Sequence, residues 1–561
     1  MKKHWKLMLV VTMVFVFTFT FALSALANRA DTVVSIGTLW GPPSNWNPLH
    51  HNPTEGTDGL MYETFFHFNS ITGEYSPWLA EEGDWIEDDV YYVRLREEAE
   101  WHDGTNLTAD DVVFTFEIAD EADTQHAPLW DHLNEVVATS TYEVEFRFDE
   151  PNYQEWNQVL YTVLIAPEHI FSEIPVDEVT DIANDENPVG SGPYTIGNAA
   201  SDRMVWERVD DWWGNDVFGQ PAPKYKEMLV TGSNAVALGM LLQGELDLTN
   251  NFIPGTPAIA ANPGYNITTY YDESPYHLSE NTAMLYMNTE QKGLDDVDFR
   301  QAIARGIDTG MIVDRAYEGT VEAADATGLF GAWLEYRDDE VVEEFGFEYN
   351  PEEAKAILDD AGYVDTTGDG WRNHPDGSDL EFDISCPAGW SDWEDSIRVI
   401  TESLRDIGIN ANNAFKDYSI YQSEMYNNEF DMMLNNFDTG ISGSPFTYWN
   451  GVANSNIDGE QAVSGNYGRY ENEELFDYIT LFNTLPDGDD TAYEVASRIQ
   501  EILLQDMPSV PLWYNGAWSM NLETYWTNWP TEDNPTGVAS TWGGMWTSGG
   551  VEMMLNLEPV Q

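Results

Sequence analysis

The sequence predicts an α/β fold, because strand-like and helix-like patterns alternate along most of its length. The chain has 561 residues, of which 42% are hydrophobic and 13% aromatic. This composition is too apolar for a disordered acidic chain. The length predicts two or three domains, each large enough to bury a core of its own.

The first half of the chain contains strand patterns and one capped helix. Residues 32–36 are rich in β-branched side chains and precede a Gly-Pro-Pro breaker, which predicts a strand. Residues 90–95 and 142–148 alternate between apolar and polar side chains, which predicts two more strands. Thr108 and Asp111 have the spacing of a capping box, so we expect a helix over about 109–120.

The second half contains clearer helix signals. Asn350 followed by Pro351 and two glutamates predicts the start of a helix, since these residues suit a cap and a first turn. Residues 380–384 alternate as a strand does. Ser391 and Glu394 have capping-box spacing and precede apolar residues at helical intervals, which predicts another helix.

The chain is strongly acidic, with 99 Asp and Glu against 23 Lys and Arg and a formal net charge of −76. This excess excludes nucleic acid as a partner, because backbone binding needs clustered cations. The acids are spread over the whole chain, which is typical of a solvated surface. At roughly 1 M salt the Debye length is about 3 Å, so such a surface is screened. We therefore interpret the chain as a halophilic acidic protein.

The first 27 residues are predicted to be a secretory signal peptide. Three lysines in residues 1–6 precede an apolar run that ends in the cleavage-site pattern Ala25-Leu26-Ala27. The apolar run is also long enough to span a bilayer, so an uncleaved anchor stays an alternative. Loss of the three lysines would change the net charge from −76 to −79. No cysteine lies nearby, so we expect an extracytoplasmic or periplasmic protein without a lipid anchor.

Motifs for catalysis are absent from the sequence. It contains no nucleophile elbow, zinc-protease motif, dinucleotide fingerprint or P-loop, and its ten histidines show no metal-ligand spacing. Its one cysteine, Cys386, allows no intrachain disulfide. Carboxylates are so abundant that a glycosidase pair would not stand out. We expect a protein that is not an enzyme and requires no cofactor, with a secreted enzyme as a remote alternative.

Residues 365–376 have the register of a twelve-residue calcium loop. Oxygen donors fall at the expected positions, and a glycine at position 6 allows the sharp turn. The same residue types also make ordinary turns, which is the competing interpretation. If calcium binds, its role would be structural, and its candidate ligands are Asp365, Thr367, Asp369, Asn373, Asp376 and the carbonyl of Trp371.

Several ordered motifs resemble one family of binding proteins. These are Val93-Arg94-Leu95-Arg96, the stretch from Ala99 to Phe116, Gly190-Ser191-Gly192-Pro193-Tyr194, Gly244-Glu245-Leu246-Asp247, Phe299-Arg300-Gln301-Ala302-Ile303, Phe430-Asp431-Met432 and Val510-Pro511-Leu512-Trp513-Tyr514. In this order they resemble the extracytoplasmic solute-binding proteins of ABC importers, in the family 5 class that includes oligopeptide-, dipeptide-, nickel- and cello-oligosaccharide-binding proteins. The Gly37–Pro48 segment looks most like the cello-oligosaccharide branch.

The resemblance implies a periplasmic-binding-protein-like fold of two lobes with an extra domain inserted in the first. Mapped motif by motif, lobe one would be 28–72, 189–285 and 511–561, the inserted domain 73–188, and lobe two 286–510. The hinge would lie near Met284–Asn288 and Ser509–Trp513. The implied partners are a ligand held between the lobes and the transmembrane subunits of an ABC permease, and we expect a monomer.

Aromatic side chains suggest which ligand such a cleft would take. The chain has 22 tryptophans, and indole faces suit the apolar faces of sugar rings, although most tryptophans belong to cores. We favour a β-linked gluco- or manno-oligosaccharide, with an oligopeptide or dipeptide as the alternative. The candidate ligand-binding residues are Trp40, Asn45, Trp46, Trp390, Asn436, Asp438, Trp449 and Trp513.

One difference from the peptide-binding relatives distinguishes a sugar ligand from a peptide ligand. Peptide-binding relatives typically hold the α-amino group of the ligand with an aspartate a few residues after the motif that resembles Phe430-Asp431-Met432. Here the matching place falls near Gly440, and Asp438 lies two residues away. This departure favours sugar, while a shifted alignment would restore the peptide reading.

Overall fold

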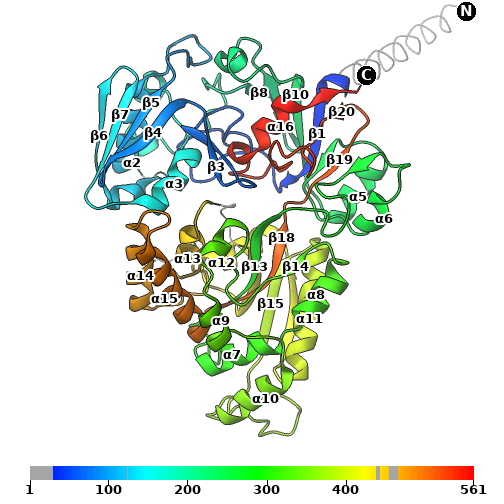
Figure 1. Ribbon diagram of the computed structural model, residues 1–561. Coiled ribbons are helices and arrows are strands. Elements are labelled where there is room, and N and C mark those ends of the chain that lie inside the picture. Colours follow the sequence, from blue (N-terminus) through cyan, green and yellow to red (C-terminus); the bar gives the residue numbers. More distant parts are fainter. Residues whose placement is uncertain (1–28, 123, 125, 437–441, 454–464, 561) are drawn as a thin grey trace, which may run out of the picture.

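The computed structural model describes residues 29–122, 124, 126–436, 442–453 and 465–560. The predicted signal peptide and Asp438 lie outside these residues. Two large mixed sheets organise the molecule, one in the upper and one in the lower half of Figure 1. The α/β class predicted from the sequence is therefore confirmed.

The upper right of Figure 1 contains the sheet of lobe one, whose seven strands run in the order β12-β19-β11-β1-β10-β9-β8. β1 is parallel to both β10 and β11, so the carboxyl ends of these three strands meet at one edge. The strands are β1 (Thr32–Leu39), β8 (Tyr194–Ala200), β9 (Arg203–Arg208), β10 (Tyr225–Val230), β11 (Leu248–Thr249), β12 (Ile267–Thr268) and β19 (Met520–Leu522), and the helices are α5 (Asn234–Leu242), α6 (Thr256–Ala260) and α16 (Gly550–Asn556).

The inserted domain is a four-stranded antiparallel sheet of order β4-β5-β7-β6. Its elements are β4 (Ala80–Glu87), β5 (Val90–Leu95), β6 (Leu133–Ser140), β7 (Glu143–Phe148), α2 (Ala109–Glu121), α3 (Tyr153–Thr162) and α4 (Glu168–Phe171). The hairpin of β2 (Phe66–Asn69) and β3 (Glu74–Pro77) leads into it. The capping box at the start of α2 is confirmed, because Thr108 and Asp111 cap each other's backbone.

Lobe one and the inserted domain share one hydrophobic core. Val33 and Trp206 from the lobe-one sheet belong to the same buried cluster as Val93 and Phe146 from the inserted sheet. Continuous packing of this kind leaves no plane along which the two parts slide freely. We therefore treat the inserted domain and lobe one as one rigid body.

Lobe two has a six-stranded sheet of order β14-β18-β13-β17-β15-β16. β15 is parallel to β16 and β17. Its strands are β13 (Ser279–Met287), β14 (Glu322–Ala323), β15 (Phe382–Pro387), β16 (Ala411–Lys416), β17 (Met432–Asn436) and β18 (Ser509–Gly516); its helices are α7 (Val297–Gly306), α8 (Thr309–Ala316), α9 (Asp339–Phe345), α10 (Pro351–Asp360), α11 (Ser391–Asp406), α12 (Tyr418–Tyr426), α13 (Phe446–Ala453), α14 (Glu473–Asn483) and α15 (Asp490–Asp506).

The sheets move the lobe boundary away from the predicted hinge. β13 and β18 pair with each other within the lobe-two sheet, so residues 279–285 and 511–516 belong to lobe two and not to lobe one. The chain crosses between the sheets before β13 and after β18, over about 269–278 and 517–519. The motifs near 284–288 and 509–513 lie on two paired strands, β13 and β18, and this backbone pairing prevents them from serving as the hinge.

Two helix starts test the capping predictions in this half. Asn350 caps α10 as predicted, since its side chain accepts a hydrogen bond from the backbone of Glu353. The capping box predicted at Ser391 does not form. The N-cap of α11 is Trp390, and Glu394 instead accepts from the backbone N–H of Gly389 at 2.9 Å.

Candidate functional site

The carboxyl ends of the parallel strands in the two lobes come together at one interface. β1 and β10 end at Leu39 and Val230, and the segments that follow them contact lobe two. β15 and β16 end at Pro387 and Lys416, directly before the residues of lobe two that make these contacts. Ligands of open α/β sheets bind outside the carboxyl ends of their strands. We therefore take this interlobe region as the candidate site.

Three aromatic rings from both lobes form its apolar part. The ring centroid of Trp40, which follows β1, lies 4.8 Å from that of Trp390 and 6.4 Å from that of Tyr418. Trp390 and Tyr418 are 6.1 Å apart and nearly parallel. Trp40 and Trp390 are half-buried, and Tyr418 is 37% exposed. The cluster thus keeps accessible aromatic surface where the two lobes meet.

A polar network lies beside the aromatic rings. The Asn234 side chain, at the start of α5, donates to Asp392 Oδ1 at 2.9 Å and to Ser391 Oγ at 3.2 Å. Its own carbonyl accepts from Asn251 at 3.2 Å. Tyr317 donates from its hydroxyl to Asp392 Oδ2 at 3.3 Å. These bonds join the first turn of α5 in lobe one to the first turn of α11 in lobe two.

Burial controls the charge of this network. The Asp392 carboxyl is removed from water, which raises its pKa from 3.8 to about 6, and hydrogen bonds from Asn234 and Tyr317 limit the rise. Burial also raises the pKa of the Tyr317 hydroxyl well above its ordinary value, with the Asp392 charge adding to the effect. Tyr317 therefore stays a neutral donor to the carboxylate.

Three of the predicted tryptophans lie in cores and not at this interface. Trp46 is 4% exposed and belongs to the core of lobe one, while Trp449 and Trp513 are fully buried in the two cores of lobe two. Trp449 packs against Phe482, and Trp513 packs against Tyr317. The structure thus corrects their placement: these three indoles are buried in hydrophobic cores, where removal of their large apolar area from water is favourable.

The predicted polar ligand-binding residues lie in different parts of the molecule. The Asn45 side chain accepts from the backbone of Asn47 at 2.8 Å and so stabilises its own turn. Asn436 ends β17, parallel to β15, and is half-buried. Asp438 lies outside the described residues. Of the predicted ligand-binding residues, the structure brings Trp40 and Trp390 into contact.

The predicted calcium ligands have other hydrogen-bond partners. Asp365 accepts from the backbone of Gly368 and Gly370 at 2.6 and 2.9 Å, and Asp376 pairs with Lys292 at 2.6 Å. Asp369 accepts from the backbone of Trp371, Thr367 donates to Asp365, and Asn373 accepts from Thr366. No group of three or more His, Cys, Asp or Glu in the described part of the chain is placed to hold a metal ion. The contacts describe a turn closed by its own backbone, and a calcium role stays a prediction.

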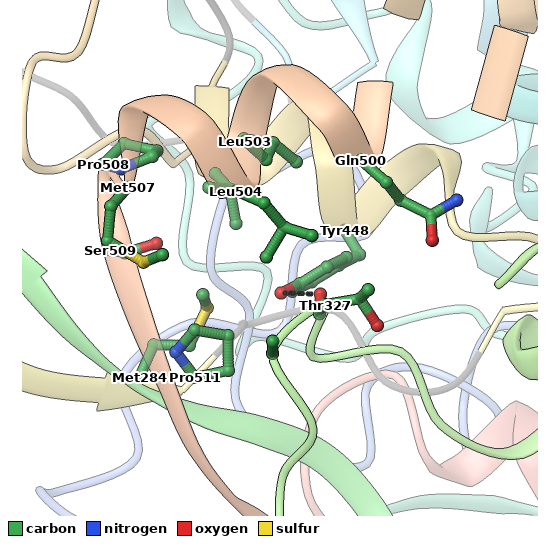
Figure 2. A pocket seen from close by; sticks show the side chains of 12 residues that line it. Met284, Thr327, Tyr448, Gln500, Leu503, Leu504, Met507, Pro508, Ser509 and Pro511 are labelled. Carbon is green, nitrogen blue, oxygen red and sulfur yellow. Dashed lines mark hydrogen bonds between the residues drawn. The ribbon is translucent and has the colours of Figure 1, made fainter. Parts of the chain in front are cut away.

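Two cavities of lobe two are lined by none of the three aromatic residues at the lobe interface. The one in Figure 2, between β13, β18 and the end of α15, has a volume of about 20 Å³. It has room for one water and none for a sugar ring. A polar pocket of about 280 Å³ is lined in part by Asp383 and Asp431, near the amino ends of β15 and β17, and by Lys416, the last residue of β16. Neither cavity is at the candidate site.

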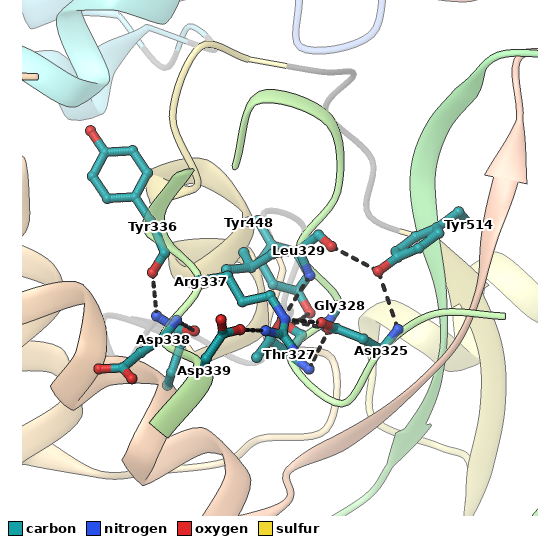
Figure 3. Close-up of polar contacts among 11 residues, drawn as sticks. Asp325, Thr327, Gly328, Leu329, Tyr336, Arg337, Asp338, Asp339, Tyr448 and Tyr514 are labelled. Carbon is teal, nitrogen blue, oxygen red and sulfur yellow. Dashed lines mark hydrogen bonds and ion pairs between the residues drawn. The ribbon is translucent and has the colours of Figure 1, made fainter. Parts of the chain in front are cut away.

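Hydrogen bonds and two ion pairs fix the loop between β14 and α9. Figure 3 shows Arg337 paired with both Asp325 and Asp339. Tyr514 accepts from the backbone of Asp325 at 3.1 Å and donates to Leu329 O at 2.8 Å. Because Tyr514 belongs to β18, these contacts hold the loop against a strand that leads directly to the crossing between the lobes.

Sequence reasoning missed Asn234, Asn251, Tyr317, Asp392 and Tyr418. Asn234 lies in the first turn of α5 and Asp392 in the first turn of α11. Such side chains near a helix start usually form hydrogen bonds with the backbone of their own helix. A signal was available, since each of these first turns follows a parallel strand directly. The rule for carboxyl ends of strands would have placed both residues at the same edge.

Two lobes with facing strand ends and a half-buried aromatic cluster between them define a solute-binding protein of the two-lobed class. Residues 74–459 match the family described as bacterial extracellular solute-binding proteins, family 5 Middle. The chain therefore belongs to the family 5 extracellular solute-binding proteins, which are binding proteins that serve ABC importers.

Relatives of two kinds are similar to the chain. The oligopeptide-binding protein AppA of Bacillus subtilis is 27% identical over 507 residues, covering 87% of this chain and 88% of the relative. A periplasmic oligopeptide-binding protein of an oligopeptide ABC transporter from Thermotoga maritima, solved with mannohexaose bound, is 42% identical, with a TM-score of 0.91 over 95% of this chain and 99% of that one. A structure of AppA from Bacillus subtilis in complex with a nonapeptide shares the fold. It is 22% identical, with a TM-score of 0.77 over 94% of this chain and 99% of that one.

In the described ranges, no helix is both long and apolar enough to cross a membrane.

Proposed function

We propose that the chain is the solute-binding component of an ABC importer that captures a β-linked gluco- or manno-oligosaccharide between its lobes. It would deliver this ligand, as an extracytoplasmic monomer without catalytic activity, to the transmembrane subunits of a permease. The observation that carries the proposal is the contact of Trp40 with Trp390 across the facing strand ends.

Indole pairs at a lobe interface suit sugar rings for a physical reason. A pyranose presents apolar C–H faces, and such a face can lie on the aromatic surface that Trp40, Trp390 and Tyr418 leave exposed, which removes it from water. Trp40 comes from lobe one, while Trp390 and Tyr418 come from lobe two, so closure brings these surfaces together. The 42% identity to a protein solved with mannohexaose supports the same ligand class.

The alternative is an oligopeptide or dipeptide. Curated relatives at 27% and 25% identity are named oligopeptide- and dipeptide-binding proteins. A peptide held through its charged ends would bind more weakly as salt rises, because screening reduces charge pairing. Affinity for a neutral sugar would change little with salt once the protein is folded.

The experiment that separates these ligands is a binding panel in high salt. Cellobiose, mannobiose, mannohexaose and a set of short peptides would be compared by thermal shift and then by calorimetry. A ligand that binds the native state alone raises the unfolding temperature. We expect shifts with the sugars; shifts with peptides alone would favour the alternative, and release of sugar products would contradict a binding protein.

A further inference from the structure

In the polar network between the lobes, the Asn234 amide and both oxygens of the Asp392 carboxyl have hydrogen-bond partners, while Oδ1 of Asn251 is buried without one. The Asn234 amide donates twice and its carbonyl accepts from Asn251. Asp392 accepts from Asn234 on one oxygen and from Tyr317 on the other. Asn234 is 3% and Asp392 4% exposed. At this exposure, neither the Asn234 side chain nor the Asp392 side chain is accessible to a ligand in this arrangement of the lobes.

The backbone is shaped to let the lobes approach here. Gly389, just before α11, has φ +91°, which a side chain rarely allows. A Cβ at Gly389 would meet Ser233 Cβ at 3.3 Å and Gly232 O at 3.6 Å. The backbone N–H of Asn234 also points to Gly389 O at 3.4 Å. The starts of α5 and α11 thus meet at a position where glycine permits close contact.

We propose that Asn234 and Asp392 form a latch between the lobes that sets the closed fraction of the ligand-free protein without contacting the ligand. The latch joins residues 158 positions apart in sequence, one from each rigid body. A hydrogen bond to a carboxylate contributes roughly 1.5–3 kcal/mol, which corresponds to a change of roughly tenfold or more in a two-state equilibrium.

The latch would control affinity through the population of the competent state. When only a fraction of the protein is closed, the apparent dissociation constant rises in inverse proportion to that fraction. Trp40 and Trp390 meet beside the latch, so opening at Asn234 would also separate the aromatic rings. Ligand affinity would therefore depend on a side chain that the ligand never touches.

The central test compares Asn234→Ala with the control Asn412→Ala. Asn412 bonds to Glu381 and Arg405 entirely within lobe two, so its loss removes hydrogen bonds of the same kind without crossing the interface. Small-angle scattering of the ligand-free proteins in high salt measures compactness. We expect a larger radius of gyration for Asn234→Ala and a wild-type value for the control.

A second variant strengthens the test. Asn234→Asp places a carboxyl opposite the Asp392 carboxyl, so it should open the lobes further than alanine does. Circular dichroism and a cooperative unfolding transition would show that each variant is folded. A wild-type radius of gyration in both Asn234 variants would overturn the latch, since the contact would then have no effect on the closure of the lobes.

The latch rests on the two-lobed binding function, but its first readout needs no ligand. With mannohexaose as the probe, we expect an affinity loss of roughly tenfold in Asn234→Ala and none in the control. If Asn234→Ala expands the free protein while no sugar binds any form, the latch stands and the proposed ligand fails. If mannohexaose binds the Asn234 variants and wild type equally well, the latch is wrong.

Discussion

The indole of Trp40, which follows a strand of lobe one, lies 4.8 Å from the indole of Trp390, which precedes a helix of lobe two, with their planes inclined at 43°. The two residues are separated by 350 positions in sequence and meet only because both follow the carboxyl ends of parallel strands. Tyr418 joins them from a third strand end. A ligand that reaches this point meets aromatic surface from both rigid bodies.

Trp40→Ala should weaken sugar binding by roughly 2 kcal/mol or more, as loss of a buried aromatic anchor does at binding hot spots. Its effect should be non-additive with that of Trp390→Ala, because the two rings contact each other. Calorimetry with mannohexaose measures both. Trp85→Ala is the matched control, since Trp85 is a half-buried indole that packs within the inserted domain. Equal affinities of Trp40→Ala and Trp85→Ala would contradict the assignment.

Trp46→Ala should act on stability and not on ligand affinity. The indole is 4% exposed in the core of lobe one, and removal of such a side chain typically costs about 3–5 kcal/mol. Denaturant unfolding should show the loss, while the folded fraction binds sugar as wild type does. If fully folded Trp46→Ala bound sugar more weakly than wild type, Trp46 would have to be assigned to the binding site.

Asp392→Asn should remove part of the pH dependence of stability. The folded pKa is about 6 against 3.8 for the ordinary group, so between these values the folded state binds the extra proton. The wild-type free energy of unfolding therefore falls, through this group, as pH rises from about 4 to 6, by about 3 kcal/mol. Asparagine does not titrate, so the Asp392→Asn variant lacks this contribution to the pH dependence.

The measurement for Asp392 is denaturant unfolding of both proteins at several pH values and constant high salt. The difference in free energy between Asp392→Asn and wild type should change over pH 4–6 and stay constant above pH 7. Glu394→Gln, on the same helix but half-buried, is the control. A constant difference over the whole range would show that Asp392 is ionised at pH 4.

Asp365→Ala should lower stability whether or not calcium is present. Its carboxylate accepts hydrogen bonds from the backbone of Gly368 and Gly370, which close the turn. Thermal unfolding would be followed with added calcium and with chelator. If calcium raised the thermal unfolding midpoint of the wild type but not that of the variant, the loop would bind calcium in addition to forming a turn.

Salt should stabilise the fold. The predicted mature chain carries a net charge of −79 if its three leader lysines are removed from the −76 total. Screening of this self-repulsion should raise the unfolding midpoint between roughly 0.1 and 1 M salt. Sodium chloride titrations measure this, with a neutral osmolyte as the control. An unchanged or falling midpoint with sodium chloride would contradict it.

Much of the fold could be predicted because local signals and global structure agree. Strand β5 and the capped helices α2 and α10 formed where alternation and caps placed them. Helix α11 also begins at its predicted cap, Ser391, but the capping box does not form, because the Ser391 hydroxyl accepts from Asn234 across the interface and Glu394 accepts from the backbone of Gly389. A cap pattern gives the position of a helix start but not the partner of its side chains.

The candidate site was predicted in part for a similar reason. Trp40, Trp46 and Trp390 were all predicted to bind ligand, yet Trp40 and Trp390 meet at the lobe interface while Trp46 is buried in a core. Sequence fixes the residue type and the local backbone, while the direction of each indole depends on which core has room for it. The Asn234–Asp392 bond spans two lobes and has no local signature at all.

The inserted domain has a consequence for how long a captured molecule stays. It shares a core with lobe one, and its helix α3 also bonds to lobe two: Gln154 donates to Leu485 O at 2.7 Å and the Glu155 backbone to Asn483 at 2.9 Å. Spontaneous escape then requires these bonds and those at Asn234 to break together. The residence time of the cargo would therefore exceed what either contact could provide, and a permease that pulls on either one would shorten it.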